Sequence, residues 1–304
     1  MKHICRGFRT VFLLSVLLAE LDSRQMFQSP SHVSRNTSKS GFDNHNKCQT
    51  VFVVFVCEVD SDSVRDNVKI PPDSFVQNMA TVMLGSALLQ NRDSCAAILG
   101  NSGEWFENRH MPRSFEHHNQ SASLCSHTEL MLNRLRAYRE FLSFETTRHP
   151  HSRNVVFCDA DLIFTGSLQH VWNFQFTVGL TFRKSWQVIN TGLMLFKSNQ
   201  VSEGCQVLDE ILEIYRERAS DKSLKHFLGD QVAASLWAKN SSPSWNTSSQ
   251  TVQKVFAGNL RKAGLLLLPS SKYNWTPRTG CRVPEGAVAL HFKGAEKSKM
   301  LQAH

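Results

Sequence analysis

The clearest candidates for chemistry are two aspartates in the middle of the chain, Asp159 and Asp161, in the segment VVFCDADLIF. One residue separates them, so in an extended backbone both carboxylates project from the same face. Two hard oxygen ligands so placed could bind Mg²⁺ or Mn²⁺ and leave room for a diphosphate. Because Asp-x-Asp also occurs by chance in loops, the pair alone leaves a solvated loop as an equal alternative.

The segment before the aspartates favours the metal interpretation. Residues 154–158 (NVVFC) are an apolar run that predicts a buried strand. Charged residues directly after a buried strand cost stability unless they have a role. In open α/β sheets, ligands bind at the carboxyl ends of the strands. We therefore expect Asp159 and Asp161 at a ligand-binding edge of a sheet.

The rest of the chain reads as an α/β domain. The run TVFVVFVC at 50–57 is continuously apolar, which is typical of a parallel strand covered on both faces. Other strands are expected at 95–99, 154–158, 176–182, 193–196, 264–268 and 287–292, and helices from Asp73, from Ser126, at 204–217 and at 229–237. With 304 residues and 41% hydrophobic content, we expect a single domain with a mostly parallel sheet flanked by helices.

A long polar segment at 101–127 interrupts this pattern. It carries four histidines, at His110, His117, His118 and His127. Loops of this length inside a compact domain are unusual and often functional. A zinc site is one alternative, although the histidines lack a recognisable ligand frame; their role stays open.

The N-terminal 47 residues are expected to lie outside the folded domain. Basic residues at 2, 6 and 9 precede a short apolar run at 11–19, which is typical of a secretory signal. We expect residues 1–23 to be a signal peptide or a short signal-anchor that leaves an N-terminal membrane anchor, 24–47 a flexible polar stem, and 48–304 the folded domain. The chain is then expected in the lumen of the ER or Golgi, or secreted.

Sequons and cysteines agree with that route. Asn-x-Ser/Thr sequons stand at Asn36, Asn119, Asn240, Asn246 and Asn274, of which Asn274 is the poorest because Pro277 follows it. The eight cysteines include no C-x-x-C pair, which argues against a structural zinc site.

Among the cysteines, some are better disulfide candidates than others. Cys57 and Cys158 lie in apolar runs and are expected to be buried thiols. Cys48, Cys125 and Cys281 lie in loops and are the better candidates for disulfides.

Several blocks, in order, resemble the nucleotide-sugar transferases of the GT-A fold related to glycogenin and the bacterial α-galactosyltransferases. They are FCDADLIFTGSLQHVW, INTGLMLF (189–196), LGDQVAASLW (228–237), LLPSSKYNW (267–275) and LHFKGAEKSKM (290–300). Together they span roughly residues 128–300, and their order is more specific than any single block. The last block departs from the family pattern, since Ser298 and Lys299 replace the usual Pro and Trp. That departure puts the closure of the C-terminal segment in question.

The resemblance implies a metal site. It makes Asp159, Asp161 and His291 the metal ligands, and a histidine among them is compatible with Mn²⁺, whereas an all-oxygen set would suit Mg²⁺ better. His291 could otherwise be a core histidine. Gly294 would let the backbone approach a phosphate, and Lys297 would neutralise the diphosphate.

The resemblance also implies a sugar site. Asn190 and Gly192 would border the donor sugar, or else form a tight turn. Asp230 and Gln231 would face the reacting carbon, unless Asp230 only caps its helix. Arg134 and Arg136, on the helix before the metal strand, are candidate donor contacts or surface charges.

The implied function is metal-dependent transfer of a sugar from a nucleotide-sugar, expected to be a UDP-sugar, to a glycan, glycoprotein or small-molecule acceptor, with retention. The alternatives are a catalytically weak GT-A domain that acts as a binding protein and, less favoured, a phosphatase of the haloacid dehalogenase type. The net charge of +8 and pI of about 9.2 suit a nucleotide, a membrane surface or an acidic glycan, or a merely soluble basic surface. No nucleic-acid partner is expected.

Overall fold

The computed structural model describes residues 48–57, 73–100, 115–119, 129–148, 153–183, 189–218, 229–241, 253–255, 264–278 and 281–302. The expected signal segment and stem (1–47) lie outside these residues, as do Ser126, His110 and His127.

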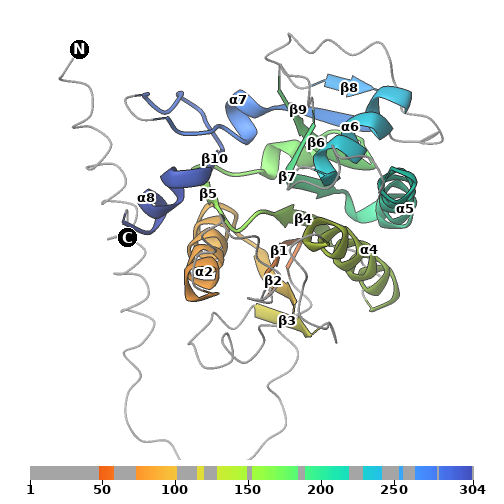
Figure 1. The fold of residues 1–304 in the computed structure, drawn as a ribbon, viewed down its shortest axis with the longest axis horizontal. Coiled ribbons are helices and arrows are strands. Elements are labelled where there is room, and N and C mark those ends of the chain that lie inside the picture. Colours follow the sequence, from red (N-terminus) through yellow and green to blue (C-terminus); the bar gives the residue numbers. More distant parts are fainter. Residues whose placement is uncertain are drawn as a thin grey trace, which may run out of the picture.

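The chain forms an α/β fold around an eight-stranded sheet in the order β3-β2-β1-β4-β7-β6-β9-β8 (Figure 1). Strands β3, β2, β1, β4, β6 and β9 run in one direction, and β7 and β8 run in the other. The strands are β1 (Thr50–Phe55), β2 (Ser94–Gly100), β3 (Phe115–Asn119), β4 (Asn154–Cys158), β6 (Val178–Phe182), β7 (Ile189–Phe196), β8 (Gln253–Val255) and β9 (Leu265–Pro269). The expectation of a mostly parallel sheet is confirmed, and the architecture is compatible with a Rossmann-like fold.

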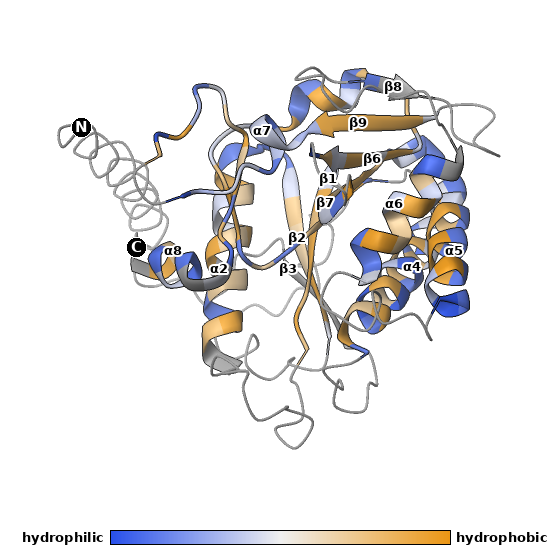
Figure 2. Ribbon diagram, turned by 45° about the horizontal axis from the view of Figure 1, so that its top comes forward, coloured by the Kyte–Doolittle hydropathy of each residue, from blue (hydrophilic) through white to orange (hydrophobic). Residues whose placement is uncertain are grey.

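The continuous apolar runs arise because the sheet is covered on both faces. In β1, Val51 and Val53 contribute to the core on one face, and Phe52 and Val54 to the core on the other. Successive side chains of a strand point to opposite faces, so both faces need apolar residues only when both are buried. Figure 2 shows the apolar strands between helices that also carry hydrophilic residues.

Helices α4 (Leu130–Arg148), α5 (Val201–Glu217) and α6 (Gly229–Ser241) cover one face of the sheet, and α2 (Asp73–Gln90) and α8 (Lys297–Gln302) lie on the other side (Figure 1). The Tyr138 ring of α4 stacks on Phe157 of β4 with 4.0 Å between ring centroids. Arg134 lies one turn before Tyr138, on the same side of the helix. This packing therefore fixes Arg134 near the carboxyl end of β4.

A second, two-stranded sheet joins the middle of the chain to its C-terminal segment. Strand β5 (Leu162–Phe164) pairs antiparallel with β10 (Ala289–His291), and His291 pairs with Leu162. The remaining short helical turns are η3 (Gln169–Asn173), η4 (Ser198–Gln200), α7 (Ser270–Tyr273) and η5 (Gly294–Glu296).

The expectation of a polar loop at 101–127 was wrong for part of this segment. Residues 115–119, expected within a polar loop, form the edge strand β3, which pairs parallel with β2; His117 and His118 are therefore strand residues. Polar composition hid this strand because an edge strand needs no continuous apolar run.

The cysteine predictions were partly correct. Cys48 forms a disulfide with Cys95, because the neighbouring parallel strands β1 and β2 begin at the same edge and bring their Cα atoms to 5.8 Å. Cys158 is a buried free thiol, as expected. Cys57 is disulfide-bonded, contrary to expectation, since it follows the end of β1 and is only partly buried. Cys281 is a free, exposed thiol rather than half of a disulfide.

Candidate metal centre

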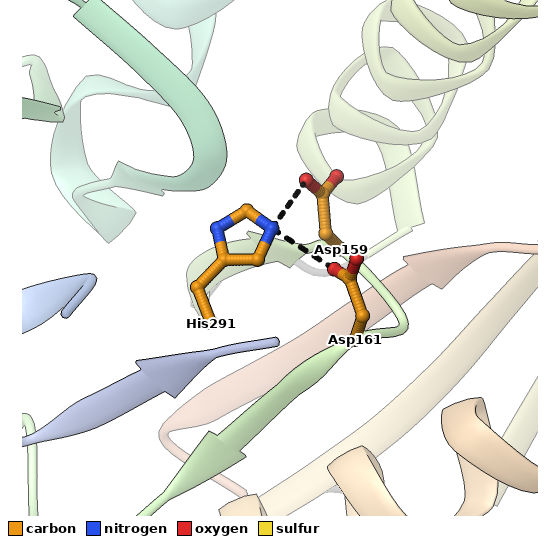
Figure 3. A group of neighbouring side chains, drawn as sticks. All are labelled: Asp159, Asp161 and His291. Atoms are coloured by element: carbon orange, nitrogen blue, oxygen red, sulfur yellow. Dashed lines mark ion pairs between the residues drawn. The ribbon is translucent and has the colours of Figure 1, made fainter. Parts of the chain in front are cut away.

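The two aspartates and His291 meet at the junction of the two sheets (Figure 3). Asp159 follows β4, and its backbone N–H donates to the Gly192 carbonyl of β7 at 2.8 Å. Asp161 precedes β5, and its carbonyl accepts from the Phe292 N–H at 2.9 Å. Pairing between β5 and β10 thus brings His291 to the aspartates across the length of the intervening chain.

The three side chains have the geometry of a metal site. One ligand atom from each of Asp159, Asp161 and His291 lies within 4.8 Å of the other two. His291 Nε2 lies 3.6 Å from Asp159 Oδ2 and 3.0 Å from Asp161 Oδ1. Asp161 and His291 are buried, and Asp159 is partly exposed. This buried cluster could therefore hold a metal ion, with the exposed side of Asp159 as a route to a ligand.

A chain of hydrogen bonds fixes the orientation of the His291 ring. The Gly192 backbone N–H donates to Asn190 Oδ1 at 2.8 Å, so that atom is an acceptor, and Asn274 Nδ2 donates to it at 3.0 Å. Asn274 Oδ1 is then the acceptor that faces His291 Nδ1 at 2.7 Å. The hydroxyl of Thr181 donates to the Asn190 carbonyl and accepts from Asn274 Nδ2, which sets the same amide orientation independently.

These hydrogen bonds place the proton of His291 on Nδ1 and direct its Nε2 at two carboxylates. Neutral imidazole with a proton on Nδ1 carries a lone pair on Nε2. Three electron-rich atoms facing one another require a cation between them, either a second imidazole proton or a metal ion. A metal-ligating histidine usually donates its other N–H to an oxygen acceptor in this way. The donor set therefore fits a divalent cation, and an imidazole nitrogen beside two carboxylates suits Mn²⁺ better than Mg²⁺.

Gly192 is required by the crowding at this point. A Cβ at this position would lie 2.7 Å from Asp159 Oδ2, 2.7 Å from His291 Cε1 and 3.0 Å from Asn190 Oδ1. The strand therefore passes directly behind two of the three candidate ligands. The alternative of a tight turn at Asn190 and Gly192 was wrong, because both residues lie inside β7.

A buried guanidinium connects the metal cluster to Asp230. Arg134 forms ion pairs with Asp159 and with Asp230, and donates to Thr191 Oγ1 at 3.1 Å. Thr191 in turn donates to Asp230. Burial works against the charge of Arg134, but the carboxylates of Asp159 and Asp230 outweigh it and raise its pKa. Asp230 is thus held by side chains of α4 and β7 rather than acting only as a helix cap.

Several polar atoms around this connection are buried without a hydrogen-bond partner. They include Asp230 Oδ1, Gln231 Oε1 and Arg134 Nε. Buried polar atoms are almost always paired, so a group of exceptions in one place indicates room for a ligand or ion. Asp230 is fully buried and Gln231 nearly so; their unpaired oxygens could accept hydrogen bonds from a bound molecule.

Two lysines add positive charge beside the aspartates. Lys297 Nζ lies 2.8 Å from Asp161 Oδ2. Burial alone would raise the pKa of Asp161, but His291 and Lys297 outweigh it and hold this pKa well below the usual carboxyl value. Burial, together with the nearby Arg183, lowers the pKa of Lys293. The cluster is therefore bordered by cations that an anionic ligand would neutralise.

Two other predicted site residues, Arg136 and Gly294, are explained by the structure without a ligand. Arg136 is exposed on α4 and donates to Asn133 at 3.3 Å, so it is a surface charge in this structure. Gly294 has a φ of +56°, which explains the glycine by backbone conformation. It begins η5, three residues before Lys297.

Sequence reasoning missed Asn274 and Thr191 as parts of the site. Asn274 was identified only as the poorest sequon, yet it is buried and both of its amide atoms are hydrogen-bonded. Its position within the block LLPSSKYNW was the available signal. For Thr191, the sequence offered no signal beyond its position between Asn190 and Gly192.

Comparison with protein-family models gives no match for this chain, and comparison with curated proteins gives no significant match. None of the helices in the described part of the chain combines the length and apolar character needed to cross a membrane.

Proposed function

We propose that this protein is a metal-dependent glycosyltransferase with a GT-A fold. It moves a sugar from a nucleotide-diphosphate sugar, expected to be a UDP-sugar, to a glycan, glycoprotein or small-molecule acceptor, with retention. The observation that carries the proposal is the convergence of His291 Nε2 with Asp159 and Asp161 at the carboxyl end of a parallel strand. Ligands of α/β sheets bind at such an edge.

The donor set suits a diphosphate bound through a cation. A bound Mn²⁺ or Mg²⁺ would act as a Lewis acid that stabilises the diphosphate as it leaves the sugar. Lys297 Nζ lies 2.8 Å from Asp161 Oδ2 and could turn to a phosphate oxygen instead. The space beside Gly294 is open, because a Cβ added to Gly294 would meet no atom within 4 Å. These features support an anionic leaving group rather than a purely structural ion.

Asp230 is the residue best placed to act on the sugar. Its carboxylate is fully buried, one oxygen is held by Arg134 and Thr191, and the other is unpaired. An ionised carboxylate there would stabilise positive charge that develops on the anomeric carbon. Gln231, with its own unpaired oxygen, could accept a hydrogen bond from a sugar hydroxyl.

The cysteines support a place in the secretory pathway. Cys48 and Cys95 form a disulfide, and Cys57 is also disulfide-bonded. Structural disulfides persist mainly in oxidising compartments. We propose a luminal location in the ER or Golgi, or secretion, with residues 1–23 as signal peptide or anchor and 24–47 as stem.

Hydrolysis of nucleotide sugars tests the function without knowledge of the acceptor. The protein is incubated with a panel of UDP- and GDP-sugars plus Mn²⁺, and release of nucleotide is followed; the matched arm contains a chelator. Metal-dependent release from one donor class is expected. Release of inorganic phosphate from a phosphomonoester instead would identify a phosphatase. Donor binding without any turnover, with or without a panel of acceptors, would identify a binding protein.

A further inference from the structure

A cavity of about 400 Å³ adjoins the metal centre. Asn190 and Asn274, which orient His291, also form part of its wall. None of the candidate metal ligands lines it, and neither does Lys297. A diphosphate held at the metal would therefore leave this cavity free for another group.

The charge of the cavity wall is positive. Arg183, which follows β6, and Arg278 both line it, and no carboxylate is among the described residues that line it. Arg183 is half-buried, and burial lowers its pKa, so its charge is partly deprived of water. Guanidinium groups bind carboxylate, sulfate and phosphate oxygens through paired hydrogen bonds. The wall is thus suited to an anion.

The neutral part of the wall suits a sugar ring. Trp275 lines the cavity and is half-buried, so it offers an apolar face with one N–H donor. Ser270 also lines it, and its Oγ is buried without a hydrogen-bond partner. Pockets that recognise small molecules combine apolar surface with a few polar groups that fix orientation. Ser270 provides such a group.

We propose that this cavity is an acceptor subsite for a sugar that carries an anionic group, either a carboxylate or a sulfate ester. The assignment as an acceptor subsite rests on the proposed transferase function. Arg183 and Arg278 bind the acidic group, Trp275 packs against the ring, and Ser270 bonds a hydroxyl. The net charge of +8 of the whole chain favours approach of an acidic glycan.

Cys281 allows a binding test that does not depend on turnover. This free, exposed thiol lines the cavity, so a bound sugar should slow its alkylation. The alkylation rate of the Cys281 peptide is measured by mass spectrometry with increasing glucuronate, glucose 6-sulfate or glucose. Both acidic sugars should protect the thiol and glucose should not. Equal protection by glucose, or no protection by either acid, would overturn the proposal.

Variants identify the anion-binding groups. Arg183→Gln and Arg278→Gln should each raise the half-protecting concentration of glucuronate about tenfold or more, as expected for loss of a hydrogen bond to a charged group. Arg282→Gln is the matched control, because Arg282 is exposed next to Cys281 but does not line the cavity. If all three variants behave alike, the arginines do not bind the acid. Arg183→Lys, which keeps the charge, guards against a folding defect.

Two further experiments distinguish an acidic acceptor from an acidic donor sugar, and failure of the cavity proposal from failure of the proposed transferase function. Protection by glucuronate that persists with saturating Mn²⁺ and UDP assigns the acidic sugar to the acceptor. Protection by UDP-glucuronate alone would assign it to the donor and refute the subsite. Arginine-dependent protection without any nucleotide-sugar turnover would refute the transferase but keep the anionic cavity, whereas turnover without protection would refute only the cavity.

Discussion

Replacing Gly192 by alanine tests the metal centre at its most crowded point. The new Cβ would stand 2.7 Å from Asp159 Oδ2 and 2.7 Å from His291 Cε1. Ordinary van der Waals contact begins near 3.4 Å, so each group must retreat by about 0.7 Å. Metal ligation tolerates displacements of only about 0.2 Å. Disturbing even an outer-shell partner of a ligand commonly costs about 10–100-fold in metal affinity, and we expect a loss of at least this size.

The assay is titration of Mn²⁺ into the metal-free protein, followed by calorimetry and by the electron paramagnetic resonance signal of free Mn²⁺. Gly166→Ala is the matched control, because a Cβ at Gly166 would meet its nearest atom at 3.6 Å. This control should bind Mn²⁺ as the parent does, and both variants should keep the far-ultraviolet circular dichroism of the fold. Parental Mn²⁺ affinity in folded Gly192→Ala would refute joint ligation by Asp159 and His291.

Three other predictions follow from the same cluster. Asp159→Asn and Asp161→Asn should each reduce turnover by several orders of magnitude, roughly 4 kcal/mol or more in activation free energy, with unchanged secondary structure; near-parental turnover would remove the metal assignment. His291→Ala should weaken Mn²⁺ binding without nucleotide, whereas Lys297→Ala should weaken UDP binding and leave Mn²⁺ affinity equal or higher, because it frees Asp161 from its ion pair; identical calorimetric profiles for the two variants would contradict these separate roles. His291 and Lys297 hold the pKa of Asp161 below its value in the unfolded chain, so ionised Asp161 stabilises the metal-free fold above about pH 4, and this contribution is lost as the pH falls further. The free energy of unfolding of Asp161→Asn should therefore fall less steeply in acid than that of the parent. An unchanged dependence on pH would contradict this role of His291 and Lys297.

The central strands could be predicted because burial on both faces requires apolar residues at successive positions, which is visible in the sequence. Strand β4 was expected at 154–158 and has these bounds, and the run from Thr50 predicted β1. Apolar residues at every position distinguish such strands from amphipathic helices such as α5, where one stripe is buried. The aspartates after β4 then placed the candidate site at the carboxyl end of this strand, where the structure brings them together with His291.

The pairing of short strands could not be predicted in the same way: a strand was expected at 287–292 and contains β10, but β5 was not expected, and neither run indicated its partner. Strands β5 and β10 have only three residues each, and each is stabilised by the other across the fold. The position of His291 beside Asp161 depends on this pairing, so only the resemblance to a family could suggest it. Asn274 was missed for the same reason: its role is set by Asn190 and His291, which come from other segments.

The C-terminal segment is held at the site with Ser298 and Lys299 at the positions where the family that the sequence resembles has Pro and Trp. The segment is held on both sides of Lys297: upstream by the pairing of β10 with β5, and downstream by Met300, which is fully buried in the core on the α2 side. Burial of a methionine side chain contributes about 1.5–3 kcal/mol. Ser298 and Lys299, at the altered positions, are exposed, and Lys299 pairs with Glu296 at 2.6 Å. Because Ser298 and Lys299 are exposed, the position of His291 and Lys297 at the aspartates rests on the pairing of β10 and the burial of Met300.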